Sequence, residues 1–241
     1  METVRQKIVI KESIVTVVAE KPYIKIAEEE IHRQRRYLED YLEKDPVFLK
    51  SFKPYPVSKD APLIIRKMAQ AAKKVGVGPM AAVAGAIAEF ALKTMIKAGA
   101  SQAIVDNGGD IAMVLSQPVI VGIYAGKSKI KDLALRFVPR GRQIIGICTS
   151  SGTVGHSISL GKADAAIVIS KNVPLADAVA TSLGNSIKEK DASNIQETLE
   201  AHTSIYGIEA ALVIIDDLLG YCGDIPEIVR AKVNYELITK G

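Results

Sequence analysis

The spacing of apolar residues near the amino terminus predicts a β-hairpin followed by a long helix. Two apolar runs, Ile8–Ile10 and Ile14–Val18, are separated by the polar turn Lys11-Glu12-Ser13. From Tyr23 to Lys44 the apolar residues recur every three or four positions, which is the period of an amphipathic helix. The residues from Val47 to Asp60 include two prolines, so we expect a loop or an extended passage there.

The rest of the chain alternates between helical and strand-like patterns. Helices are expected at Pro62–Val75, Pro79–Lys97, Pro174–Lys188 and Asn194–His202, and prolines suit the first turns of the second and third. Short apolar runs predict strands at Gln102–Asp106, Ile111–Leu115, Pro118–Tyr124, Leu133–Val138, Gln143–Cys148, Ala165–Ile169, Ala210–Ile215, Leu218–Cys222 and Val229–Leu237. Glycines or charged turns bound several of these runs, which favours an antiparallel or mixed sheet and the α+β class.

The segments that begin at Pro79 and Pro174 can be aligned proline to proline, and both open a helix of small residues. Shared helix-start chemistry explains such a match, and so does an ancient duplication into two α+β halves, the second beginning near residue 140. In the duplicated arrangement two alanines of the first half take the positions of polar residues in the second: Ala82 for Asp177 and Ala86 for Thr181. We expect one domain spanning residues 1–241.

The charge of the chain excludes some partners. It has 241 residues, with 31 basic and 27 acidic side chains, a net charge of +4 and no long block of either sign. This mildly basic character attracts phosphates but lacks the basic patch typical of nucleic-acid binding. We therefore expect no nucleic-acid partner, and the sequence is compatible with a homo-oligomer.

The cysteines and the apolar segments indicate a cytoplasmic protein. Cys148 and Cys222 are the only cysteines, and no zinc or redox spacing is present, so a reducing compartment is expected. The first seven residues alternate charged with apolar side chains, unlike a signal peptide. The most apolar helical segment, Met80–Ile96, contains Glu89 and Lys93, so we expect a buried core helix and no membrane partner.

Asp177 and Thr181 are the first candidate site. They lie four residues apart, which places a carboxylate and a hydroxyl one turn apart on one helix face. A hard cation such as Mg²⁺ binds oxygen donors, usually few from the protein, with substrate phosphates completing its shell. The alternative is structural: Asp177 would offset the helix dipole while Thr181 bonds back to a carbonyl.

Two loops are candidates for nucleotide contacts. Asp106-Asn107-Gly108-Gly109-Asp110 lies between two predicted strands; its glycines allow a close backbone approach to phosphate, and an ordinary hairpin turn is the alternative. The segment from Cys148 to His156 offers hydroxyls, glycines and an imidazole that could hold a phosphate or a ribose; its hydroxyls are Thr149, Ser150, Ser151 and Thr153. A Ser–His pair there could also serve nucleophilic chemistry. The structural alternative is a polar loop with no binding role.

The order of these segments resembles that of the ApbE-type flavin transferases. Ala84–Ala88 and Ala103–Ile111 are similar to the family's "GGIAKG … ALVNLGGDI" stretch. Thr149–Gly152 resembles its "ATSG" loop, and Ala176–Thr181 resembles its "ADALAT" helix start. Four blocks in the same order are more specific than any one alone.

The resemblance implies a T-fold-like α+β domain built from two related halves. It also implies Mg²⁺ bound by the Asp and Thr of the last block and a carbonyl of the first, hence by Asp177, Thr181 and Ala88. In the family this metal engages the pyrophosphate of FAD, and FMN is transferred to a Ser or Thr hydroxyl of an acceptor protein with release of AMP. The implied nucleotide-binding residues are Gly108, Gly109, Asp110, Thr149, Ser150, Ser151, Gly152 and His156.

The chain also departs from the family pattern. Glu89 stands where the family has Lys, and the family's "H-I-D-P-R-T-G" motif has no clear counterpart around His156. The pattern is similar to a separate, mostly archaeal branch of ApbE-like proteins that has been associated with sulfur assimilation and homocysteine formation. A non-catalytic ligand-binding or accessory protein, with Cys148 as a sulfur-carrying residue, is therefore the alternative to an enzyme that handles FAD.

Overall fold

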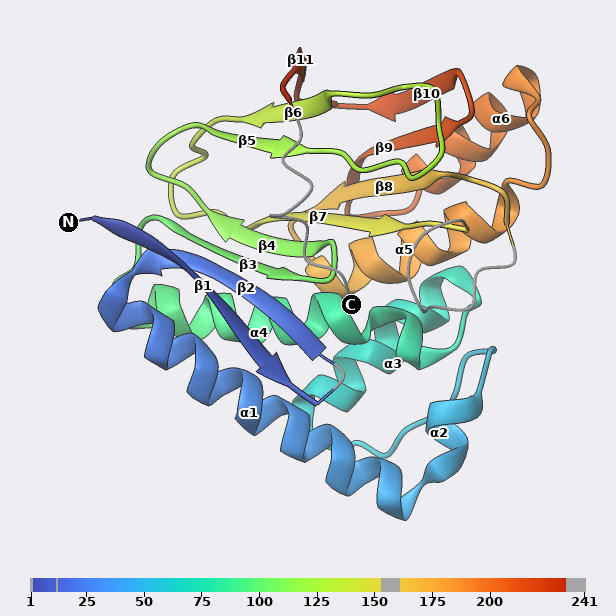
Figure 1. Ribbon diagram of the computed structural model, residues 1–241. Coiled ribbons are helices and arrows are strands. Elements are labelled where there is room, and N and C mark those ends of the chain that lie inside the picture. The colour runs from blue at the N-terminus through green and yellow to red at the C-terminus, as the bar shows by residue number, and fades with distance from the viewer. Residues whose placement is uncertain (1, 12, 153–160, 233–241) are drawn as a thin grey trace.

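An antiparallel sheet of eight strands forms the centre of the molecule (Figure 1). The computed structural model describes residues 2–11, 13–152 and 161–232. The strands follow the spatial order β1 (Thr3–Ile10), β2 (Ser13–Glu20), β3 (Ala103–Asn107), β4 (Asp110–Val114), β7 (Ile145–Ser150), β8 (Ala165–Ser170), β9 (Ile208–Ile215) and β10 (Leu218–Gly223). A second sheet has the order β11 (Glu227–Arg230), β6 (Leu133–Phe137) and β5 (Val119–Gly122).

The large sheet consists of two sets of four strands that are arranged alike. In each set, helices separate the second strand from the third along the chain. The first set carries α1 (Lys21–Lys44), α2 (Pro46–Lys50), α3 (Leu63–Val75), the 3₁₀ turn η1 (Pro79–Ala82) and α4 (Val83–Lys97). The second carries α5 (Val173–Ser186) and α6 (Ala192–Thr203). The antiparallel pairing of β4 with β7 joins the sets. This arrangement supports an internal duplication, which remains a prediction.

Both faces of the large sheet are covered, so its central strands are buried on both sides. On β8, Ala166 and Val168 belong to the core shared with the helices, whereas Ala165, Ile167 and Ile169 belong to the core shared with the small sheet. Figure 1 shows the long helices on one side of the sheet and β5 and β6 on the other. The alternation follows from the two-residue period of a strand.

The apolar segment from Pro79 to Lys97 is long and apolar enough to cross a membrane by composition alone. In the structure it is the core layer, because α4 packs against the sheet and Ala88, Ala91, Leu92 and Met95 are fully buried. The prediction of a buried core helix is confirmed.

The α+β class and the antiparallel sheet are confirmed, and two local predictions are wrong. The start of the expected loop is α2, where Pro46 occupies the first turn and Phe48 is fully buried. The Phe48 ring packs edge-on against Tyr41 and Tyr55, with ring centroids 5.2 and 6.0 Å apart. The last strand, expected from Val229 onward, starts at Glu227; residues 233–237 of that prediction lie outside the described part.

Candidate functional site

Asp177 lies on the first turns of α5 and points at the beginning of α4. Its Oδ2 accepts a hydrogen bond from the Gly85 amide at 2.8 Å. The side chain is buried, and this burial raises the pKa of Asp177 to about 7, although hydrogen bonds from the Gly85 and Ala84 amides oppose the shift. The structural alternative predicted that Asp177 offsets the dipole of its own helix; the hydrogen bond instead caps the beginning of α4.

The turn between β3 and β4 reaches the same place. Gly108 and Gly109 have positive φ angles of 68° and 100°, which favour glycine and turn the chain within two residues. The Asn107 side chain is buried, and its Nδ2 donates to the Ala84 carbonyl at 3.2 Å. The turn is therefore tied to the end of α4 that Asp177 caps.

Asp110 follows this turn and is buried with one oxygen unsatisfied. Its Oδ1 has no hydrogen-bond partner among the described residues. Burial raises the pKa of Asp110 well above its usual value, and the charge of Asp177 raises it further. An unpaired buried oxygen costs about 1–3 kcal/mol, and none of the described residues compensates that cost, so the atom is a candidate ligand-binding oxygen.

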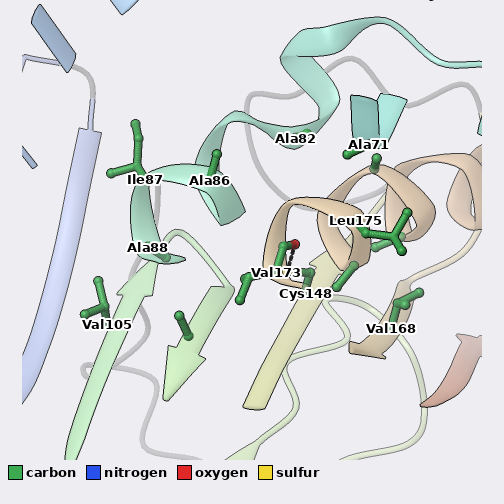
Figure 2. Close-up of a cluster of buried hydrophobic side chains, with 14 of the residues drawn as sticks. Ala71, Ala82, Ala86, Ile87, Ala88, Val105, Cys148, Val168, Val173 and Leu175 are labelled. Carbon is green, nitrogen blue, oxygen red and sulfur yellow. Dashed lines mark hydrogen bonds between the residues drawn. The ribbon is translucent and has the colours of Figure 1, made fainter. Parts of the chain in front are cut away.

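Cys148 lies on β7 beneath the first turn of α5. Its Sγ is 3.6 Å from the Val173 carbonyl oxygen, the contact drawn as a dashed line in Figure 2. The thiol is fully buried; burial, and then the charge of Asp110, raise the pKa of Cys148 well above its usual value. A thiol of this kind is unreactive, which argues against a sulfur-carrying role.

The polar end of β7 lies between the turn and α5. A Cβ on Gly109 would come within 3.9 Å of the Thr149 Cβ, and a Cβ on Gly184 of α5 would lie 3.3 Å from the Ser150 Oγ. The Gly152 amide donates to the Ala163 carbonyl at 2.9 Å. Ser151 and Gly152 follow the strand, and His156 lies outside the described residues.

The resemblance also implied Thr181 and Ala88 as metal ligands, and the structure places these two residues in different surroundings. Thr181 is half-buried one turn after Asp177 on α5. Ala88 lies inside α4 among buried hydrophobic side chains (Figure 2). Because a carbonyl inside a helix bonds to the amide four residues later, the Ala88 carbonyl is engaged within α4. Its role as a ligand stays a prediction. The Ala84 amide hydrogen-bonds to Asp177, and the Ala84 carbonyl accepts from Asn107.

Glu89 is a functional candidate that the sequence showed as a charged residue in an apolar segment and as a departure from a family pattern. It is buried in α4, and its Oε2 accepts from the Val173 amide at 2.9 Å. Burial alone would raise the pKa of Glu89, but hydrogen bonds from Lys67 and Lys93 hold it below the usual value. The signal was a charged residue in an otherwise apolar helix face, which is rarely buried without partners.

Within the described ranges, no three His, Cys, Asp or Glu side chains form a group able to hold a metal ion. Asp177 and Asp110 nevertheless fit a hard cation. Both carboxyl groups are buried, the charge of Asp177 raises the pKa of Asp110, and Asp110 has an unsatisfied oxygen. Mg²⁺ typically takes one or two protein carboxylates and completes its shell with water and phosphate oxygens. The arrangement suits a metal bound together with a phosphate compound.

The fold matches solved structures of ApbE-type proteins. A mutant of the flavin transferase ApbE from Vibrio cholerae aligns with a TM-score of 0.59 at 13% identity, over 92% of this chain and 97% of the other. The apo flavinyl transferase ApbE from Pseudomonas stutzeri aligns with the same score and identity over 100% and 98%. At these identities the likeness shows the fold alone.

A family model described as "AbpE bacteria" matches residues 2–204, and the chain belongs to this family. Relatives named UPF0280 protein agree with this assignment. The one from Methanocella arvoryzae is 50% identical, over 96% of this chain and 94% of its own length. The one from Methanosarcina barkeri is 48% identical, over 98% and 93%. The predicted relationship to a mostly archaeal ApbE-like branch is confirmed.

Proposed function

We propose that the protein is a Mg²⁺-dependent enzyme that handles FAD or a related pyrophosphate nucleotide. In its most specific form the reaction transfers FMN to a Ser or Thr hydroxyl of an acceptor protein. We place it in the cytoplasm, without a membrane or nucleic-acid partner. The fold supports the flavin-related part, since the flavin transferases named above share it.

The observation that carries the proposal is the pair of buried carboxyl groups, Asp177 and Asp110. Burial of two carboxyl groups that interact electrostatically is unfavourable unless a cation or protons compensate their charge. Perturbed carboxyl groups of this kind cluster at functional sites. The unsatisfied Asp110 Oδ1 supports a cation rather than a purely structural role.

The residues of the chain would divide the work as follows. Asp177 and Asp110 would hold Mg²⁺, with the Thr181 hydroxyl one turn away. Mg²⁺, when bound, supplies positive charge that offsets the charge of a pyrophosphate. The Gly108–Gly109 turn allows a close approach of the substrate to the backbone. Thr149 lies beside the turn and the Ser150 hydroxyl lies beside α5, so both would be near the bound nucleotide.

Titration calorimetry with FAD tests the proposal. We expect binding with millimolar Mg²⁺ and none with EDTA. Asp177→Asn should weaken binding at least about 10-fold, since the amide oxygen can still accept from Gly85 while the charge is lost. Asp191→Asn is the matched control, because Asp191 also caps a helix but is exposed and lies at α6. Wild-type protein that binds neither flavin nor adenine nucleotide at millimolar Mg²⁺ would refute the proposal.

A non-catalytic accessory protein in sulfur assimilation remains the alternative. The burial of Cys148 weakens the residue on which that alternative depended.

A further inference from the structure

Helices α4 and α5 cap each other. The Asp177 carboxylate of α5 accepts from the Gly85 amide of α4 at 2.8 Å. In return, the Glu89 carboxylate of α4 accepts from the Val173 amide of α5 at 2.9 Å. In each helix the carboxylate that accepts follows the amide that donates by four residues: Glu89 follows Gly85, and Asp177 follows Val173. The two hydrogen bonds are therefore reciprocal.

The two helices also touch through their backbones at this point. A Cβ on Gly85 would lie 2.7 Å from the Val173 carbonyl oxygen and 2.9 Å from the Asp177 Cβ. Both backbone polar groups of Val173 are therefore held by contacts. Its amide bonds to Glu89, and its carbonyl lies against Gly85 and the Cys148 thiol. A shift of this residue would move Asp177, one turn further along α5.

The two carboxylates differ in how their charge is compensated. Glu89 forms ion pairs with Lys67 of α3, at 2.8 Å, and with Lys93 of α4. Among the described residues, the groups that lower the pKa of Asp177 are the backbone amides of Gly85 and Ala84. Two lysines thus compensate the charge of Glu89, whereas no cationic side chain of the described residues lowers the pKa of Asp177.

We propose that Glu89 is a positioning residue that holds the first turn of α5, and with it the Asp177 carboxylate, against α4. The effect on the metal rests on the proposed function; the effect on α5 does not. Outer partners that orient a metal ligand typically change metal affinity about 10- to 100-fold when they are removed. The important property of Glu89 is then its acceptor oxygen for the Val173 amide.

Two substitutions separate this role from simple loss of charge. Glu89→Gln keeps an acceptor for Val173, and Glu89→Ala removes it; both leave Lys67 and Lys93 without their carboxylate. Cys148 reports on α5 without any metal, because its Sγ lies beneath Val173. With Cys222→Ser in all proteins, Cys148 is the only thiol.

The experiment measures the rate of Cys148 alkylation in EDTA and, separately, the Kd for Mn²⁺. We expect Glu89→Ala to label at least about 10-fold faster than wild type and to bind Mn²⁺ at least about 10-fold more weakly. Glu89→Gln should stay within about 3-fold of wild type in both. Leu199→Ala removes a buried side chain of α6 and is the control for general destabilisation. The labelling rates of the two variants are compared at urea concentrations that give them the same free energy of unfolding.

The following results would overturn the positioning role of Glu89, its effect on the site, or the proposed function. The positioning of α5 by Glu89 is overturned if Cys148 is labelled no faster in Glu89→Ala than in Leu199→Ala. It is also overturned if Cys148 is labelled as fast in Glu89→Gln as in Glu89→Ala. Unchanged Mn²⁺ affinity in Glu89→Ala overturns the effect on the site. If wild type binds no Mn²⁺ but the labelling order holds, the proposed function fails while the positioning of α5 by Glu89 stands.

Discussion

The Asp177 carboxylate of α5 accepts a hydrogen bond from the Gly85 amide of α4 across a distance of 2.8 Å. The Asp177 side chain therefore has two effects: it caps the beginning of α4, and its charge raises the pKa of the buried carboxyl group of Asp110. A cap alone does not need a second carboxyl group nearby. The pair is what distinguishes a candidate metal site from an ordinary helix end.

The crossing of α4 and α5 at Gly85 should not tolerate a methyl group. In Gly85→Ala the new Cβ would meet the Val173 carbonyl oxygen at 2.7 Å and the Asp177 Cβ at 2.9 Å. Overpacking of this kind costs about 1–3 kcal/mol, which exceeds the gain of up to about 1 kcal/mol from helix propensity. Urea denaturation should show a net loss. Gly184→Ala in α5 is the control, since its nearest contact is the movable Ser150 hydroxyl at 3.3 Å; an equal loss in both would contradict the account.

The stability of the metal-free protein should fall as the pH rises towards neutral. The pKa of Asp177 is about 7 in the folded state, above the value of 3.8 for an ordinary carboxyl group. Its contribution to stability is fully present below about pH 4 and is lost as the pH rises through about 7, at up to about 1.4 kcal/mol per pH unit. Thermal melts in EDTA should show this slope in wild type, and a smaller slope in Asp177→Asn. Added Mg²⁺ should raise the melting temperature more at about pH 8 than at about pH 5.

Asp110→Asn should stabilise the metal-free protein and weaken metal binding. Burial raises the pKa of Asp110, so its contribution also falls with rising pH, and an uncharged amide removes that loss. We expect a gain in the free energy of unfolding at about pH 8 that shrinks towards about pH 4. Denaturation in EDTA at both pH values measures it. If the Asp110→Asn protein is less stable than wild type at the higher pH, the carboxyl group is needed for folding itself.

Ser182 and His202 should link α5 to α6. The Ser182 Oγ lies 3.2 Å from the His202 Nε2, and the His202 Nδ1 lies 2.7 Å from the Thr198 carbonyl oxygen. With Nδ1 as the donor to that carbonyl, Nε2 accepts from the serine hydroxyl. A double-mutant cycle of Ser182→Ala and His202→Ala should give a coupling of about 0.5–1.5 kcal/mol. Additive losses would show that the contact contributes nothing.

The secondary structure was predictable from local patterns, because most elements carry their own signal. The period of apolar residues located the hairpin and α1, and prolines marked the beginnings of η1 and α5. The pattern missed α2 because two later prolines suggested an extended passage. The burial of Phe48 between Tyr41 and Tyr55 is a tertiary contact that no local pattern contains.

The site was predictable only in part. The order of motifs pointed to Asp177 and the Gly108–Gly109 turn, but the partner of Asp177 is 92 positions away along the chain. The hydrogen bonds also relate α4 and α5 by an alignment that differs from the proline-to-proline alignment of the sequence. The reciprocal bonds align Glu89 with Asp177, and Lys93 with Thr181, in place of Ala82 and Ala86. Such a relationship depends on how the helices cross, which the spacing within each helix does not determine.

The central claim is a divalent cation held by Asp177 and Asp110. The most direct measurement is anomalous scattering from a crystal soaked with Mn²⁺ and FAD. The account predicts a peak about 2.0–2.2 Å from oxygens of both carboxylates, on the side of the Gly108–Gly109 turn. A fully soaked crystal with no peak there, or with Mn²⁺ only at surface carboxylates such as Asp216 and Asp217, would contradict it.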